Sequence, residues 1–239
     1  MLIARLTFRP PLWATLLLLA ACALFASAGF WQLSRMAQKA DLFAEFDREA
    51  AADPAPGLLS DTGAAVARFR PVRLRGRYDP DHQVLLDSMV RNGVPGYQVL
   101  TPLRTPAGNV LVNRGWIAAD ADRDRLPDLG VSADDREIRG QVAQLPQPGL
   151  RLDAVPVDPA APWPRRLLFP TAEQIAGQLG YPVRDYQVLL APEAPAGFVR
   201  DWRPEVSGPD LHLGYAVQWF AFAVAVTVIY LALNLKKRG

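Results

Sequence analysis

The sequence predicts a membrane protein of the α+β class, in which two transmembrane helices flank an extracytoplasmic antiparallel β domain with one small helix. Hydrophobic residues make up 50% of the 239 residues, but the mean hydropathy is only +0.04, so the apolar residues are concentrated in parts of the chain. Two apolar runs near the two ends are long enough to cross a bilayer. Between them, short apolar segments alternate with Pro, Gly and Asn, a pattern typical of strands joined by turns.

The first transmembrane helix is predicted at residues 12–33. No charged residue occurs between Arg9 and Arg35, and this run exceeds the roughly 20 residues that cross a hydrocarbon core. A removable signal peptide is the alternative, because arginines precede the leucine run and residues 26–28 (Ala-Ser-Ala) fit a cleavage site. The apolar run is long for a signal peptide and continues past that site, which favours the membrane helix.

The second transmembrane helix is predicted at residues 211–235, and three basic residues follow it within residues 236–239. Basic residues gather on the cytoplasmic side of a membrane, so we expect this C-terminus in the cytoplasm. Two spans then place residues 1–11 on the same side and residues 34–210 outside the cytoplasm. Two basic residues just beyond the first span weakly oppose this orientation, namely Arg35 and Lys39.

The composition excludes several classes of protein. The net charge is +2 with both signs interspersed, which gives no basic surface for nucleic acid. Cys22 is the only cysteine, so the chain has no intrachain disulfide, Cys-x-x-Cys redox site, covalent haem attachment or paired-thiolate metal site. The preference for Arg over Lys and the abundance of Ala and Pro are typical of GC-rich bacterial genomes. We therefore expect a protein of the bacterial inner membrane, with lipid as its surroundings.

The segment between the spans is predicted to begin with a continuation of the first helix at residues 36–46, which ends at residues 53–57. The clearest β signal is a hairpin in which strands 97–103 and 110–117 flank a loop of Pro, Gly and Asn. Further strands are predicted at residues 72–77, 84–86, 136–145 and 183–190.

One short helix is predicted at residues 171–179. Thr171 and Gln174 have the spacing of a capping box, and Gly180 supplies the stop. The Pro-rich segment at residues 146–164 is expected to form a long surface connection.

The β domain carries no catalytic pattern. His82 is its only histidine, and we find no Ser/His/Asp spacing, metal-ligand pattern or phosphate loop, so we expect no enzyme activity and a surface position for His82. Arg73, Arg75 and Arg77 alternate at period two. They either dock on anionic lipid or an acidic partner, or form a solvated strand face, which we favour.

His212 lies at the outer mouth of the second span. On a helix it shares a face with Tyr215, Trp219 and Phe222, at offsets of three, seven and ten. Neutral imidazole is an axial ligand of haem iron, and an aromatic stripe supplies an apolar wall for a porphyrin. The alternative is an interfacial histidine beside aromatic residues that pack helices. The residue types alone leave both interpretations open.

Four separated motifs follow one another along the chain. They are residues 29–35 (GFWQLSR), 96–103 (GYQVLTPL), 110–117 (VLVNRGWI) and 212–220 (HLGYAVQWF). In content, order and near-full-length coverage they resemble the Surfeit-locus family of cytochrome c oxidase assembly proteins. The stretch between Gly140 and Pro209 carries no motif of that family.

The resemblance implies the same two-span topology and a function in assembling the aa3-type cytochrome c oxidase, by binding haem a non-covalently and assisting its insertion into subunit I. The family's haem histidine falls on His212, with Tyr215, Gln218 and Trp219 matching its neighbours. The expected cofactor-binding residues are therefore His212, Tyr215 and Trp219, with His212 on the haem iron. The implied protein partners are oxidase subunit I and haem a synthase.

Two other functions remain open at this point. One is a scaffold that holds subunit I without binding haem, and the other is a membrane-anchored extracytoplasmic sensor or binding domain. We also expect Arg114, Gly115 and Trp116 to contact the partner or the haem propionates. Gly115 is either a bulge or point of close approach, or an ordinary strand glycine.

Overall fold

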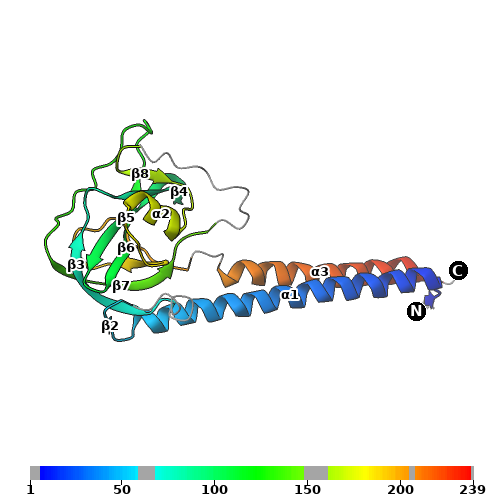
Figure 1. Ribbon diagram of the computed structural model, residues 1–239. Helices are drawn as coiled ribbons and strands as arrows, with labels where there is room; N and C mark the ends of the chain where they lie inside the picture. The colour runs from blue at the N-terminus through cyan, green and yellow to red at the C-terminus, as the bar shows by residue number, and fades with distance from the viewer. Residues whose placement is uncertain (1–5, 59–67, 148–160, 205–207, 238–239) are drawn as a thin grey trace. The chain divides into compact units, whose positions relative to one another are not determined.

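The computed structural model describes residues 6–58, 68–147, 161–204 and 208–237, and the chain divides into two compact units (Figure 1). The helical unit comprises Met1–Glu45 and Pro204–Gly239, and the β domain comprises Phe46–Arg203. The terminal arginines at positions 5 and 238, which entered the predictions on targeting and orientation, lie outside the described residues, as does most of the Pro-rich segment 146–164.

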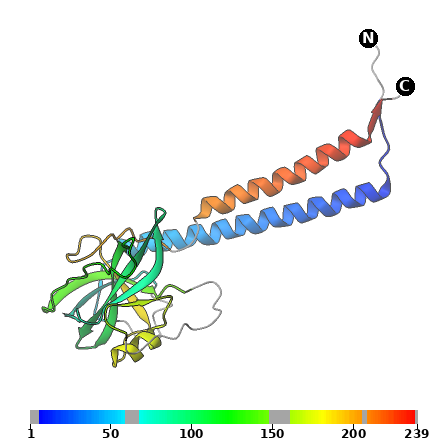
Figure 2. The ribbon, with the colours of Figure 1, turned by 90° about the horizontal axis from the view of Figure 1, so that it is seen from above.

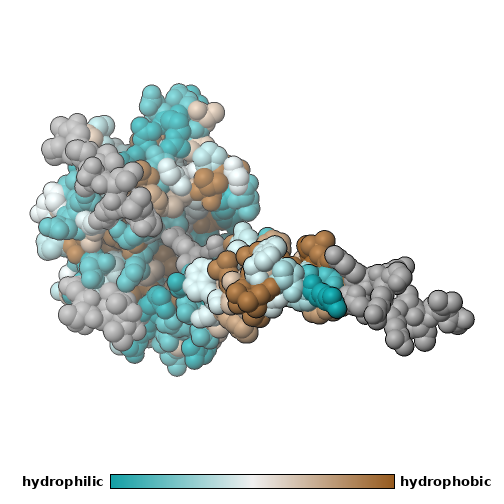
Figure 3. Space-filling model, turned by 90° about the vertical axis from the view of Figure 1, so that its right-hand side faces the viewer, coloured by the Kyte–Doolittle hydropathy of each residue, from teal (hydrophilic) through white to brown (hydrophobic). Residues whose placement is uncertain are grey.

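The helical unit is an antiparallel pair of long helices, α1 (Leu12–Ala50) and α3 (Pro209–Asn234), which lie side by side in Figures 1 and 2. Two short strands, β1 (Leu6–Phe8) and β10 (Leu235–Lys237), pair antiparallel at one end of this unit. Both helices are long and apolar enough to cross a membrane. Their apolar side chains remain largely exposed within the unit, and part of this surface is seen in Figure 3.

Helix α1 is one continuous helix of 39 residues, about 58 Å long. A hydrocarbon core is about 30 Å thick, so the predicted span at residues 12–33 and the predicted continuation at residues 36–46 fit within one helix. It ends at Ala50, just before Asp53 and Pro54, as the breaker residues predicted.

Eight strands form one sheet in the described part of the β domain. Its strands are β2 (Ala55–Pro56), β3 (Pro71–Tyr78), β4 (Val84–Arg91), β5 (Val94–Thr105), β6 (Gly108–Ala118), β7 (Arg136–Gln144), β8 (Arg165–Leu167) and β9 (Tyr186–Leu190). Their order is β2-β3-β7-β9-β6-β5-β4-β8, and β5 also pairs with β3. This last pairing, which sets Arg77 opposite Arg104 and Tyr78 opposite Leu103, closes β3, β7, β9, β6 and β5 into a small barrel.

The prediction of an antiparallel β domain needs correction in three places. The pairs β2–β3, β4–β8 and β6–β9 are parallel, while the other pairings of the sheet are antiparallel. Two parallel strands cannot be joined by a tight turn, so they are separated along the chain. For example, β7, β8 and α2 lie between β6 and β9 in the sequence. The hairpin of β5 and β6 agrees with the sequence prediction because its strands and its turn are adjacent.

The buried apolar side chains of the described β domain form three clusters, and the alternation of the strands separates the two largest. The first fills the barrel and includes Leu74, Val112, Val142, Tyr186 and Val188. The second lies on the opposite face of β4, β5 and β6, where α2 (Ala172–Leu179) packs through Ile175 and Leu179. Residues next to one another on β6 thus serve different cores, with Leu111 in the second and Val110 and Val112 in the first. Both faces of β6 are therefore covered at these three residues, which explains why consecutive residues are apolar.

Helix α2 forms as its sequence predicts. The Thr171 hydroxyl accepts a hydrogen bond from the Gln174 backbone N–H, and the Gln174 side chain accepts one from the Thr171 backbone N–H, which completes the capping box. Gly180 ends the helix with φ = 74°, a left-handed conformation that glycine adopts without strain.

Candidate functional site

The predicted haem ligand, His212, lies in the first turn of α3 and is half-buried. Its Nδ1 atom is 2.8 Å from the side-chain oxygen Oε1 of Gln32 on α1. An amide oxygen only accepts hydrogen bonds, so Nδ1 carries the proton in this contact. In the neutral ring with its proton on Nδ1, the other nitrogen, Nε2, has the lone pair that binds a metal.

An aromatic cluster lies on the same helix pair. The half-buried ring of Trp219 is 5.9 Å from that of Phe25 on α1, and 5.8 Å from that of Phe222. Phe25 and Phe222 are also 5.8 Å apart, so the three rings contact one another. Tyr215 is 46% exposed, and the ring contacts within the described residues do not join it to this cluster. Of the predicted aromatic neighbours, Trp219 is therefore packed against α1 and Tyr215 is open to the surroundings.

A close approach of the two helices fixes their register near His212. Gly29 of α1 is buried, and a Cβ atom there would lie 2.7 Å from Cζ of Phe220 on α3. Ala216, one turn after His212, is also buried. Small residues on facing helices allow such close packing in membrane proteins. Gln32 follows Gly29 by three residues on α1, so this contact helps to hold Gln32 and His212 at the same level.

Sequence patterns place His212 and Trp219 on one face of α3 but do not single out Gln32 or Phe25. Both lie on α1, and the register of α1 against α3 is not encoded in either helix alone. The sequence did contain a signal for Gln32, because it is the only amide side chain in the apolar run at residues 12–33. An amide that is removed from water in such a run requires a hydrogen-bond partner.

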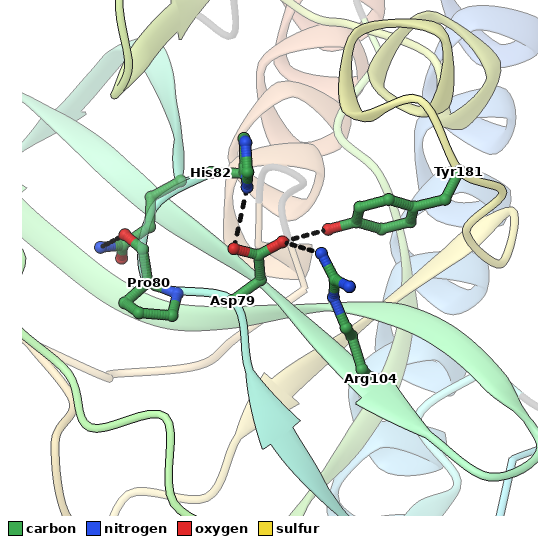
Figure 4. A network of polar contacts seen from close by, with 6 residues as sticks. Asp79, Pro80, His82, Arg104 and Tyr181 are labelled. Atoms are coloured by element: carbon green, nitrogen blue, oxygen red, sulfur yellow. Dashed lines mark hydrogen bonds and ion pairs between the residues drawn. The ribbon is translucent and has the colours of Figure 1, made fainter.

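A second polar cluster lies in the β domain around Asp79, directly after β3 (Figure 4). The carboxylate is only 6% exposed and accepts hydrogen bonds from Nη2 of Arg104 at 2.6 Å and from the Tyr181 hydroxyl at 2.8 Å. His82 Nδ1 is 2.9 Å from its other oxygen. His82 therefore lies at the surface as predicted, with its side chain 36% exposed, but the prediction missed its contact with Asp79. Its ring belongs to this network because the turn at residues 80–82 brings it next to Asp79.

The network sets the ionisation of its members. Burial raises the pKa of Asp79, but the hydrogen bonds from Arg104, His82 and Tyr181 outweigh burial and lower the pKa from 3.8 to about 2. Burial, followed by the hydrogen bond to the Asp79 carboxylate, raises the pKa of Tyr181, so its hydroxyl remains a donor. The cluster is a saturated structural unit that joins the end of β3 to β5 and to the segment after α2.

Asp79→Asn is expected to lower the free energy of unfolding by about 2 kcal/mol at neutral pH. The pKa of Asp79 is lower in the folded state, so its stabilising effect is present above about pH 4 and is lost as the pH falls through 2. Equilibrium denaturation of the full chain in detergent at pH 7 and pH 2 measures this difference. Asp81→Asn is the matched control, because Asp81 is exposed. Equal losses at both pH values would contradict the prediction.

Arg114 does not have the position that we expected for a partner or propionate contact. Its side chain is 1% exposed, and the guanidinium group donates within the β domain. Its acceptors are the carbonyl oxygens of Leu129, Gly130 and Ala196 at 2.7–3.1 Å, the side-chain oxygen of Gln83 at 2.9 Å and the hydroxyl of Thr101 at 3.4 Å. These contacts occupy the guanidinium fork, so Arg114 stabilises the domain and is not free to bind a ligand.

Gly115 and Trp116 also have structural roles within the β domain. The register of β5 against β6 shifts at this point, so that Gln98 lies opposite Trp116 but Leu100 lies opposite Asn113. Gly115 is thus part of a bulge, with φ = 113°. The Trp116 indole donates a 2.7 Å hydrogen bond to the carbonyl oxygen of Met89. The alternative of an ordinary strand glycine was wrong.

The alternating arginines of β3 form a solvated strand face, as we favoured. Arg73 and Arg75 are exposed and pair with Glu137 and Asp135 of the neighbouring strand region, at 3.7 Å and 3.0 Å. The described residues contain no group of three or more His, Cys, Asp or Glu side chains that could hold a metal ion.

The two units together define a class of protein: a small closed β domain joined to two helices that have the length and composition of membrane spans. The SURF1 family model matches residues 19–224 of the chain, which is most of its length, and the chain belongs to this family. The matched region contains all four motifs that resembled the Surfeit-locus family, and it also covers the stretch between Gly140 and Pro209. The comparison with curated proteins gives no match.

Family membership gives the chain a general role in cytochrome oxidase assembly. Members of the family are assembly factors and are not known as enzymes. The two long apolar helices agree with anchoring in a membrane.

Proposed function

We propose that this protein is an assembly factor of the bacterial inner membrane that binds haem a and assists its insertion into subunit I of the aa3-type cytochrome c oxidase. The observation that carries the proposal is the contact of His212 Nδ1 with Gln32, which leaves Nε2 as a potential iron ligand. Haem a synthase is the proposed donor of the haem, and subunit I is the recipient.

The membrane topology is part of this proposal. Apolar side chains such as Leu17 and Val224 are more than 60% exposed within the helical unit, and water would disfavour so large an apolar surface. A bilayer is the proposed cover for this surface, and α3, at about 39 Å, is long enough to cross it. The basic residues after the second span support an orientation with both ends of the chain in the cytoplasm and the β domain on the other side.

The residues around His212 are suited to haem in three respects. The imidazole is half-buried, its Nδ1 proton is engaged, and the rings of Trp219, Phe25 and Phe222 supply an apolar wall nearby. Tyr215 lies on the same helix face with its side chain exposed. A haem held by one protein ligand keeps its second axial position for a ligand from the recipient, which suits a carrier.

His212→Ala is expected to abolish haem a binding. The measurement is the absorption spectrum of the detergent-purified full chain from cells that make haem a, in which the wild type should show a Soret band. His82→Ala is the matched control, because His82 is the only other histidine and belongs to the Asp79 network of the β domain. The control should keep the Soret band.

A colourless wild type, or a His212→Ala variant that binds haem as the wild type does, would overturn the carrier mechanism. The protein would then assist subunit I as a scaffold without binding haem.

A further inference from the structure

We infer that Gln32 is a positioning residue for haem ligation, which holds His212 as the Nδ1-protonated tautomer and so prepares Nε2 for iron. This inference rests on the proposed role of His212, but its first test needs no haem. Gln32 lies in the second half of the apolar run of α1, and its side-chain oxygen is 2.8 Å from His212 Nδ1.

The packing of α1 against α3 indicates that the contact between Gln32 and His212 is fixed by the two helices. Gly29 on α1 allows Phe220 of α3 to pack directly on the backbone, and Ala216 is buried one turn from His212. Phe220 also packs edge-on against Phe30, with ring centroids 5.4 Å apart. The helices are thus locked against sliding near the Gln32–His212 pair, where any shift would separate the two side chains.

The chemical reason concerns which ring nitrogen is free. Neutral imidazole carries its proton on either Nδ1 or Nε2, and only the unprotonated nitrogen can bind a metal. A hydrogen-bond acceptor on Nδ1–H selects the tautomer, fixes the ring orientation and raises the basicity of Nε2. A neutral amide accepts less strongly than a carboxylate. Gln32 therefore orients the ligand without making the iron bond as strong as Glu would, which fits a cargo that has to be released.

The first test is the tautomer of His212 in the full chain, purified in detergent without haem and labelled with ¹⁵N-histidine. The sequence has only two histidines, so two imidazole spin systems are expected, and His82→Ala assigns them. We expect His212 to be protonated on Nδ1 in the wild type, and Gln32→Leu to shift it towards protonation on Nε2. A wild-type His212 protonated on Nε2, or the same tautomer in both proteins, would overturn the inference.

The second test is a titration with haem a and a measurement of its reduction potential. Gln32→Leu is expected to weaken haem affinity on the order of 10–100-fold. Gln32→Glu is expected to bind haem more tightly than the wild type and to lower the reduction potential, because a carboxylate increases electron donation from the ligand. Gln38→Leu is the matched control, since Gln38 is an exposed glutamine of α1 that contacts Ser34 and Arg35.

The outcomes separate this inference from the proposed function. If the wild type binds no haem a, the proposed function fails and Gln32 has no haem ligation to support, and the tautomer then shows only whether Gln32 orients the His212 ring. If the wild type binds haem through His212 but Gln32→Leu has unchanged affinity and potential, the positioning role fails and the proposed function stands.

Discussion

Arg114→Met is expected to lower the free energy of unfolding of the full chain by about 3–5 kcal/mol. Met has a similar length, but it removes the side-chain donor of the Gly130 and Ala196 carbonyl oxygens and one of the two donors of the Leu129 carbonyl, which keeps Gln83. Each buried acceptor that loses its partner costs about 1–3 kcal/mol. The guanidinium group also lies 4.9 Å from the ring of Phe198, so its loss weakens the packing of that segment.

Denaturation in detergent, followed by near-ultraviolet circular dichroism, measures the loss. Arg75→Met is the matched control, because the Arg75 side chain is 77% exposed and its ion pair with Asp135 is solvated. Exposed ion pairs contribute about 0–1 kcal/mol, so this control should be nearly neutral. Arg114→Lys should recover only part of the loss, since one ammonium cannot replace the planar fork. Equal stability of Arg114→Met and Arg75→Met would show that the buried contacts are not stabilising.

The contrast between Arg114 and Arg75 also shows what sequence patterns convey. The exposed positions of Arg73 and Arg75 follow from period-two alternation, which is a local property of one strand. The position of Arg114 depends on backbone carbonyls of Leu129, Gly130 and Ala196, up to 82 residues away along the chain. A backbone carbonyl has no sequence signature, so a buried arginine of this kind resembles a functional one until the fold is known.

The same distinction between local and distant information explains how much of the fold could be predicted. The ends of α1, the capping box of α2 and the hairpin of β5 and β6 are set by neighbouring residues, and they agree with the prediction. The closure of the barrel through β3 and β5 and the parallel pairing of β6 with β9 depend on strands that meet only after folding. Alternation on each strand gives the faces, but it does not choose the partner.

The candidate site divides in the same way. Helical periodicity alone is enough to put His212, Tyr215 and Trp219 on one face of α3. The residues that complete the site, Gln32 and Phe25, come from α1, about 180–200 positions away. Their contribution depends on the register of α1 against α3, which the close contact between Gly29 and Phe220 fixes in the folded protein.

Gly115→Ala is expected to lower the free energy of unfolding by about 3 kcal/mol, through strain and steric overlap together. The φ angle of 113° is one that residues with a Cβ rarely adopt. A Cβ atom at this position would lie 2.6 Å from the carbonyl oxygen of Val199. That carbonyl cannot easily retreat, because backbone hydrogen bonds join Phe198 to the Arg114 carbonyl and Val199 to Trp116, one on each side of Gly115.

Gly177→Ala provides the matched control with the opposite sign. Gly177 is exposed in the interior of α2, and a Cβ atom there would have no neighbour within 4 Å among the described residues. Alanine should raise the free energy of unfolding by about 0.5–1 kcal/mol, because glycine loses more backbone entropy in a helix. The same denaturation experiment compares the two variants. If Gly115→Ala leaves the free energy of unfolding unchanged or raises it, as Gly177→Ala should, the bulge at Gly115 has room for a side chain, and the approach of Val199 does not constrain the domain.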